Sequence, residues 1–190
     1  PPHDRGSSHG DTRITRLAIG EGAEYTPLAL RSHEIWREIE TRTGASLLTT
    51  TGGLVISSAG PRGTCHGTEF FANTLAAAQA HGIRHEILDA GEIRRRFPAF
   101  AVRDDEVGYY EHEAGFLRPE ACVAAQLQLA GQFGAEIHRG ETALRFTEEK
   151  GVVHLRTDHG QYRARRLVVT AGPWLPGLLG DTWAGRFTVR

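Results

Sequence analysis

Hydrophobic residues recur at helical spacing in three stretches of the chain. We expect the first helix to have Thr26 as its N-cap and Pro27 as its first helical residue, and to end at Gly44. A second helix is expected over residues 68–81, and a third from Pro119 onwards. Their apolar faces are Leu28, Ile35, Trp36 and Ile39 in the first helix, Phe71, Leu75 and Ala78 in the second, and Val123, Leu127 and Ala130 in the third.

Strands are predicted between and after these helices. Residues 47–56 are rich in β-branched residues, but Gly52-Gly53 interrupts them, which predicts a bulge or a close approach to a ligand. A capping box of Asp89 and Glu92 predicts one short helix. The apolar run at 167–172 is typical of a buried strand that presents its backbone to a ligand. Shorter strands are expected over residues 83–88, 107–110, 142–147, 152–157 and 161–164, the last three as a meander. The fold class is therefore α/β or α+β.

Composition narrows the function classes. A net charge of −1 argues against a nucleic-acid binder, which needs a basic face, and no apolar run is long enough to predict a membrane span. The two cysteines, Cys65 and Cys122, are too far apart for a CxxC site and too few for a disulfide framework, so a cytoplasmic location is expected. The first residue is proline rather than methionine, which suggests a trimmed chain or a segment of a longer one.

Short catalytic motifs are present only in part. Gly20-Glu21-Gly22 begins GxGxxG, but Tyr25 stands at the third glycine position. A GxSxG match centred on Ser8 lacks the preceding strand of a hydrolase elbow. The single lysine, Lys150, lies in a predicted turn, which excludes a P-loop. Three His-Glu pairs begin the HExxH signature and none completes it, so no metal site is expected.

Residues 1–24 show neither the helical nor the strand period of hydrophobic residues. We interpret them as a long loop that either lines a site or forms a tail. Within it, Arg13 and Arg16 would share a face if this piece took a helical turn. Two neighbouring guanidinium groups repel each other unless an anion lies beside them, and carboxylate and phosphate are their natural partners. The pair is therefore a candidate anion site.

Several short sequence blocks along the chain, one of which contains this candidate anion site, form a recognisable pattern. The blocks are residues 1–3, Gly6-Ser7-Ser8-His9-Gly10-Asp11-Thr12-Arg13 with Arg16, Gly20-Glu21-Gly22, Thr51-Gly52-Gly53-Leu54, Gly115-Phe116-Leu117-Arg118-Pro119-Glu120, and Ala171-Gly172-Pro173-Trp174. Together, and in this order, they resemble the family of monomeric sarcosine oxidase and N-methyl-L-tryptophan oxidase, flavoenzymes that oxidise secondary amino acids. The resemblance extends over nearly the whole chain.

The resemblance implies a mixed α/β part of a two-layer flavoprotein fold, in which FAD lies between a dinucleotide-binding domain and a sheet-based substrate domain. Residues 1–45 would be a flavin-contacting loop and helix, 46–117 part of the substrate domain and 118–190 part of the FAD-binding domain. Arg16 would hold the substrate carboxylate and, with Arg13 and His9, form the catalytic set. The residues implied to contact FAD are Ser8, His9, Thr12, Arg13, Ala143, Thr170, Ala171, Gly172 and Trp174.

The chain also departs from the family pattern. The βαβ unit with its GxGxxG loop, the lysines beside the flavin and the cysteine that bonds it are all expected to lie outside these residues, and Ser8 replaces the first histidine of the usual His-His-Gly. We therefore expect the 190 residues alone to bind FAD poorly and to be inactive.

Three functional interpretations follow. The first is an FAD-dependent oxidase that converts N-methyl or other secondary amino acids with oxygen and releases hydrogen peroxide. The second is an amino-acid dehydrogenase of the same fold that passes electrons elsewhere, and the third is a non-catalytic α+β binding domain. The expected partners of the oxidase are a small amino acid and oxygen, without nucleic acid or membrane.

Overall fold

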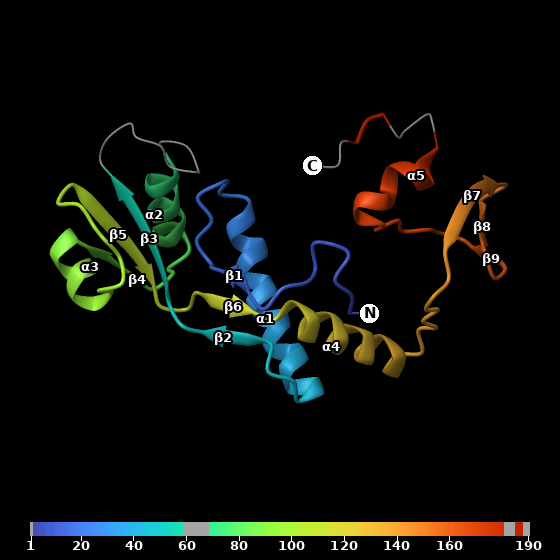
Figure 1. The fold of residues 1–190 in the computed structure, drawn as a ribbon, viewed down its shortest axis with the longest axis horizontal. Helices are drawn as coiled ribbons and strands as arrows, with labels where there is room; N and C mark the ends of the chain where they lie inside the picture. The colour runs from blue at the N-terminus through green and yellow to red at the C-terminus, as the bar shows by residue number, and fades with distance from the viewer. Residues whose placement is uncertain (1, 59–68, 181–184, 188–190) are drawn as a thin grey trace. The chain divides into compact units, whose positions relative to one another are not determined.

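The computed structural model describes residues 2–58, 69–180 and 185–187, and divides the chain into two units (Figure 1). The larger unit is Gly10–Leu129, and the smaller combines Pro1–His9 with Ala130–Arg190. Cys65 and Thr68, the first residue of the second predicted helix, lie outside the described residues.

The order of elements confirms a mixed α/β chain. Along the larger unit the elements are β1 (Arg13–Thr15), α1 (Tyr25–Thr43), β2 (Leu48–Thr50), β3 (Gly53–Ser58), α2 (Phe70–Ala80), β4 (His85–Leu88), α3 (Ala90–Arg96), β5 (Glu106–Glu111), β6 (Gly115–Leu117) and all but the last turn of α4 (Pro119–Gln132). The smaller unit adds β7 (Ala143–Glu149), β8 (Val152–Thr157), β9 (Gln161–Ala164), a 3₁₀ turn (Gly172–Trp174) and α5 (Leu175–Leu179).

Two antiparallel sheets form the larger unit. One has the order β1-β6-β2 and the other β3-β5-β4. Strand β1 lies in the region predicted to be an irregular loop, and three residues are too few for a period to be visible in the sequence. It pairs with β6, which follows about a hundred residues later, so a long-range contact rather than local propensity fixes it.

Gly52 divides the strand predicted over residues 47–56 between the two sheets. Its φ of +76° belongs to the left-handed region that glycine adopts readily. A Cβ at this position would collide with the hydroxyl of Tyr110. In the structure the close approach at Gly52 is to the Tyr110 side chain, and β2 and β3 leave this glycine in different sheets; the predicted approach to a ligand stays a prediction.

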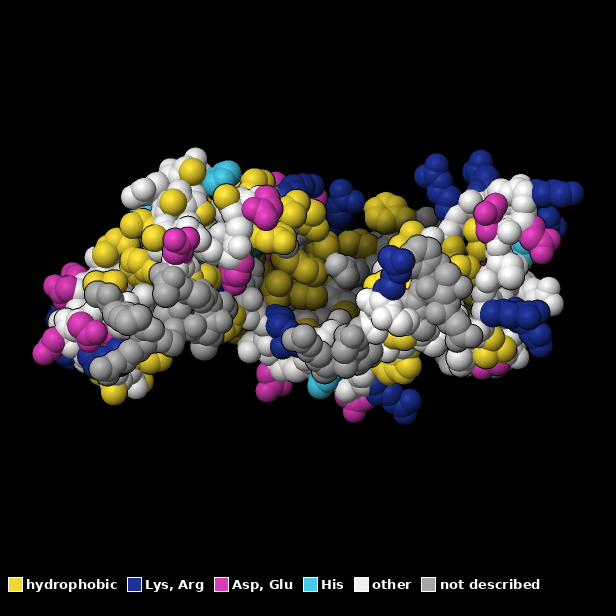
Figure 2. Space-filling view, turned by 90° about the horizontal axis from the view of Figure 1, so that it is seen from above, with side chains coloured by type: hydrophobic (Ala, Val, Ile, Leu, Met, Phe, Trp, Pro, Cys, Tyr) yellow, Lys and Arg dark blue, Asp and Glu magenta, His cyan; other side chains and the backbone are white. Residues whose placement is uncertain are grey.

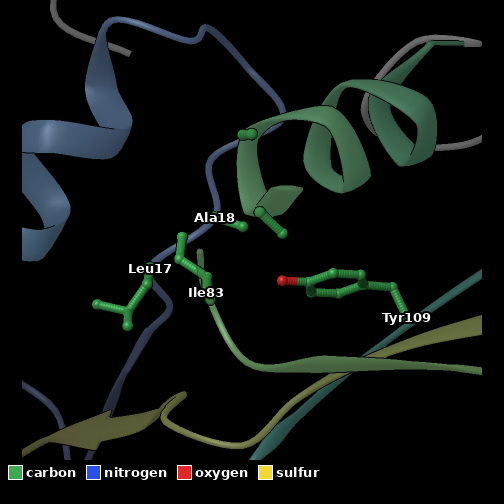
Figure 3. Close-up of a cluster of buried hydrophobic side chains, with 6 residues drawn as sticks. Leu17, Ala18, Ile83 and Tyr109 are labelled. Atoms are coloured by element: carbon green, nitrogen blue, oxygen red, sulfur yellow. The ribbon is translucent and has the colours of Figure 1, made fainter. Parts of the chain in front are cut away.

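Helices α2 and α3 cover opposite faces of the β3-β5-β4 sheet. Tyr109 on β5 joins the α2 side, where it packs with Leu17, Ala18, Ala77, Ala78 and Ile83 (Figure 3). Its neighbour Tyr110 packs on the α3 side, against the cluster of Leu88, Ala90, Ile93 and Val102. This alternation is the period of two that a strand imposes on its side chains. The predicted capping box of Asp89 and Glu92 is confirmed at the start of α3.

Helix α1 ends where it was predicted and begins earlier. Gly44 has φ +73°, and its N–H bonds to the Glu40 carbonyl at 2.8 Å, as in a left-handed C-cap. Thr26 is not the N-cap, because the helix already includes Tyr25; its hydroxyl instead accepts a bond from the Ile19 N–H at 3.3 Å. The predicted apolar face is only half correct: Ile39 is buried, whereas Leu28 is 66% exposed.

The buried face of helix α4 differs from the predicted face of Val123, Leu127 and Ala130. Cys122 and Ala125 are buried against α1, and Leu129 packs beside them. Cys122, Ala125 and Leu129 are at helical spacing as well, so periodicity does not distinguish their face from the predicted one. Packing against Ile39 and Leu47 decides between them.

The predicted meander of the smaller unit is confirmed. Strands β7, β8 and β9 pair in sequence, and Lys150 and Gly151 both take positive φ in the turn between the first two. Figure 2 shows Lys and Arg side chains standing out around this meander.

The predicted buried strand at 167–172 is not present as a strand. Residues 166–171 belong to no helix or strand and have no paired neighbour among the described strands, Val168 is 83% exposed, and Gly172 opens the 3₁₀ turn. A buried strand needs strands beside it to satisfy its backbone, and the β7-β8-β9 sheet does not supply one.

Candidate functional site

A cavity of about 400 Å³ lies within the larger unit, where its two sheets meet. It is lined by Thr12, Ile14 and Arg16, by residues 51–55, by Tyr109 and Glu111, and by residues 114–116. Most of these side chains are apolar, and Arg16 brings the positive charge. A pocket with an apolar wall and few polar groups is the usual form of a small-molecule site.

The strand geometry of β1 decides which predicted residues reach this cavity. Thr12, Ile14 and Arg16 are two residues apart and line it together, as alternate positions of extended chain do. Arg13 falls between them and does not line it; its Nη1 donates to the Thr12 carbonyl at 3.2 Å. The shared face expected of a helical turn is therefore wrong for Arg13 and Arg16.

Arg16 is the cationic side chain in the wall of this cavity and the residue best suited to bind an anion. Its Nη2 donates to both carboxylate oxygens of Glu21, at 2.6 and 2.5 Å, and its guanidinium lies 5.0 Å from the ring centroid of Phe70. The side chain is 23% exposed. Its Nε is buried and bonds to no acceptor among the described residues. A guanidinium held in this way keeps donors available for an anion.

A buried carboxylate lies on the same wall. Glu111 ends β5, is 1% exposed, and accepts bonds from the backbone N–H groups of Leu17 and Ala18 and from the Tyr109 hydroxyl. Burial, followed by the Glu111 charge, raises the pKa of Tyr109 far above its usual range, so this hydroxyl stays protonated. Sequence reasoning missed both residues, although a glutamate two positions from a core tyrosine on a strand is a usable signal.

A second, more open cavity of about 510 Å³ lies beside α1 in the same unit. It includes His33, whose Nε2 lies 2.8 Å from the Thr15 hydroxyl, and burial lowers the pKa of this histidine. The cation in its wall, Arg37, is already bonded to Glu40, the Leu48 carbonyl and the Thr50 hydroxyl. These bonds tie α1 to β2, so we assign this cavity a structural role.

The remaining predicted residues belong to the smaller unit and are accessible. Ser8, His9, Ala143, Thr170 and Gly172 are exposed, Ala171 is partly buried and Trp174 is 55% exposed. Gly172 has φ +55°. An accessible backbone next to a glycine turn is suited to contact a ligand. The contact of these residues with FAD therefore stays a prediction.

Neither a metal centre nor a membrane span is found in the described part of the chain. Across residues 2–58, 69–180 and 185–187, no three His, Cys, Asp or Glu side chains are grouped so that they could hold a metal ion. No helix within the same ranges has both the length and the apolar character needed to cross a bilayer.

Comparison with known proteins defines the class. Residues 2–190 match the family described as FAD dependent oxidoreductase, and the chain belongs to this family. It is 42% identical over 181 residues to monomeric sarcosine oxidase of Streptomyces avermitilis, covering 95% of this chain and 45% of that protein. It is 34% identical over 182 residues to N-methyl-L-tryptophan oxidase of Citrobacter koseri, covering 95% and 47%. The chain thus spans about half the length of these relatives.

Solved structures agree with the fold. NikD, an amino acid oxidase essential for nikkomycin biosynthesis, superposes with a TM-score of 0.79 at 28% identity, over 94% of this chain and 44% of NikD. L-proline dehydrogenase from P. horikoshii superposes with a TM-score of 0.76 at 17% identity, over 97% and 47%, which is a likeness of fold alone.

Proposed function

We propose that this chain is part of an FAD-dependent oxidase of N-methyl or other secondary amino acids. The observation that carries the proposal is Arg16, a partly buried guanidinium on the wall of a mainly apolar cavity. The 42% identity to a monomeric sarcosine oxidase supports the same substrate class. An amino acid matches such a cavity because its carboxylate pairs with the guanidinium while its carbon skeleton contacts apolar walls.

In this proposal Arg16 orients the substrate. A bidentate pair with the carboxylate fixes the position of the α-carbon and of the attached nitrogen, which lowers the entropic part of the barrier. Ile14, Leu54 and Phe116 would exclude water around the substrate. Glu21 holds the guanidinium in the absence of an anionic ligand, so the substrate has to compete with it.

The residues present fit FAD on a structural ground. Residues 166–170 pair with no described strand, so their backbone N–H and C=O groups are not used in a sheet and could contact a polar ligand. The residues proposed to hold the cofactor are Thr170 of this stretch, Ala171, Gly172 and Trp174 of the turn that follows it, and Ser8, His9, Thr12, Arg13 and Ala143. When bound, FAD supplies the two-electron oxidation of the C–N bond.

The overall reaction follows from the substrate class. An N-methyl amino acid, oxygen and water would give the demethylated amino acid, formaldehyde and hydrogen peroxide. We propose that oxygen is the electron acceptor and that the reaction takes place in the cytoplasm. We also propose that residues 46–117 contribute to the substrate domain and 118–190 to the FAD-binding domain, with 1–45 contacting the flavin.

The test is substitution of Arg16 in the flavin-loaded protein that carries this chain. We expect R16A to lower kcat/KM for an N-methyl amino acid by at least about 30-fold, since the carboxylate loses a partner worth ~2 kcal/mol or more. The assay is hydrogen peroxide release, and R31A is the matched control because Arg31 pairs only with exposed glutamates of α1. An R16A variant with unchanged KM would contradict the proposal, and turnover with a dye but without peroxide would indicate a dehydrogenase.

A further inference from the structure

Glu111 is a buried charge in the larger unit that the proposed chemistry does not use. Among the described residues it is the one charged side chain that is fully buried, at 1% exposed. A carboxylate leaves water at little net cost only if hydrogen bonds replace its hydration. Here the Leu17 N–H donates to Oε1 at 2.6 Å, while the Ala18 N–H and the Tyr109 hydroxyl each donate to Oε2 at 3.0 Å.

The two backbone donors belong to the residues that directly follow Arg16. Strand β1 ends at Thr15, so the N–H groups of Leu17 and Ala18 lie beyond its ladder with β6. Both residues are buried, at 3% and 0% exposed, and a buried N–H without an acceptor is costly. Glu111 supplies that acceptor from another strand, and thereby anchors the chain beside Arg16.

Tyr109 supports the carboxylate from the same strand. Figure 3 shows its ring in the buried cluster, with the hydroxyl oxygen directed toward the segment that carries Leu17 and Ala18. The ring stacks on His85 at a centroid distance of 5.4 Å and an interplanar angle of 21°, which restricts its orientation. The hydroxyl is therefore a fixed donor.

We propose that Glu111, supported by Tyr109, is a positioning residue for Arg16: it fixes the backbone from which the guanidinium reaches the substrate carboxylate. This inference rests on the proposed function of Arg16. The side chain of Arg16 has to exchange Glu21 for a substrate, and a bidentate contact forms in good geometry only if the backbone below it stays in place. Glu111 provides this restraint through its bonds to the Leu17 and Ala18 N–H groups.

The experiment compares two substrates that differ only in the group that Arg16 recognises. One is an N-methyl amino acid and the other is its methyl ester, which has the same C–N bond to oxidise but no carboxylate. The readout is the ratio of kcat/KM for the acid to kcat/KM for the ester, measured on the flavin-loaded protein. A variant that merely unfolds or loses flavin lowers both values and leaves the ratio unchanged.

Each variant removes a different part of the hydrogen bonding around Glu111. In E111Q, one carboxylate oxygen becomes an amide NH₂, which cannot accept from a backbone N–H, and we expect the ratio to fall about tenfold, mainly through KM for the acid. Y109F removes one donor and should lower the ratio about two- to threefold. E106Q is the control on the same strand, because Glu106 bonds to Arg103 instead. R16A should abolish most of the preference for the acid.

The outcomes separate the two proposals. If R16A abolishes the preference while E111Q and Y109F keep it, Arg16 binds the carboxylate but Glu111 does not position it, and the inference is overturned. If R16A keeps the preference, the proposed function of Arg16 fails and the inference fails with it. If E111Q does not fold, Y109F decides, since it keeps the carboxylate and both backbone bonds: an unchanged ratio rejects the inference.

Discussion

Arg16 is a side chain with two competing anionic partners under the proposed function. In the structure its Nη2 donates to both oxygens of Glu21, five residues later, and its guanidinium faces the ring of Phe70. Ion pairs that are partly exposed contribute little net free energy, because water solvates the separated charges well. The pair with Glu21 therefore orients the guanidinium, but a substrate carboxylate could replace Glu21 at a small cost in free energy.

Removal of the Glu21 charge should make the guanidinium easier to capture. We expect E21Q to lower KM for the amino-acid substrate by about two- to fivefold, which corresponds to the free energy of a partly exposed ion pair. The measurement is steady-state peroxide release at low salt, where the effect is largest. E34Q, which alters a pair on the outer face of α1, should leave KM unchanged. A higher KM in E21Q would show that Glu21 orients Arg16 instead of competing for it.

At the scale of elements, β6 is the strand on which the cavity depends. It lies between β1, which carries Thr12, Ile14 and Arg16 to the cavity, and β2. Gly115 faces Thr15 on one side and Thr50 on the other. A Cβ here would collide with the Thr49 carbonyl, so the three strands come together only around a residue without a side chain.

G115A should therefore disturb both stability and the cavity. Because the obstructing atom belongs to the backbone, we expect a loss of about 1–3 kcal/mol in the free energy of unfolding. The matched control is G131A in α4, where nothing lies within 4 Å of the added Cβ. This control should gain about 0.5–1 kcal/mol, because alanine is the better helix former. Equal unfolding midpoints in urea for the two variants would contradict the packing argument.

Glu40 joins α1 to β2 and makes this connection depend on pH. Its carboxylate accepts from the Leu47 and Leu48 N–H groups at 2.7 and 3.0 Å and pairs with Arg37. Burial acts to raise the pKa of Glu40, but the two backbone bonds and Arg37 outweigh it, so the pKa lies below its ordinary value of 4.5.

A carboxyl group with a lowered pKa stabilises the fold above its unfolded pKa, and this contribution is lost as the pH falls through the folded value. We expect E40Q to cost about 1–2 kcal/mol near pH 7 and progressively less below pH ~4.5. Urea unfolding of wild type and E40Q across this range measures the difference. E38Q, which loses a half-exposed pair with Arg31, should stay within about 0.5 kcal/mol at every pH.

Local signals and long-range contacts explain what could be predicted from the sequence. Gly44, the capping box of Asp89 and Glu92, and the turn at Lys150-Gly151 all act within a few residues, and their predictions are confirmed. Strand β1 and the buried face of α4 depend on partners distant in the chain, and both were missed. The candidate site follows the same rule: Arg16 stands in a recognisable block, whereas the role of Glu111 depends on contacts with Leu17 and Ala18, which are distant in the chain.

At the scale of the whole molecule, the proposed site residues are shared between two compact units. Thr12 and Arg16 belong to the larger unit, where a cavity already brings Arg16 together with Glu111. Thr170 and Trp174 belong to the smaller unit and are exposed. The proposed substrate contacts therefore lie within the larger unit, whereas Thr170 and Trp174 would bring the cofactor contacts of the smaller unit.

Hydrogen exchange provides that test for the smaller unit. Under the proposed function, FAD should protect the backbone amides of residues 168–172, which now lack a strand partner among the described residues. Comparison of the flavin-loaded protein with the same protein stripped of flavin measures the change. Strand β8, already paired on both sides, serves as the internal control and should change little. Equal exchange at 168–172 in both forms would contradict a cofactor contact there.

The packing of α4 against α1 has a consequence for oxidative damage. Cys122 is buried between these helices, and burial raises the pKa of its thiol. The thiolate, which is the form that reacts with peroxide, is therefore scarce at neutral pH, and the residue is only 6% exposed. A protein whose proposed turnover releases peroxide beside its own chain thus keeps this sulfur atom in its least reactive state, and sulfenic acid should form at Cys122 only after the two helices separate.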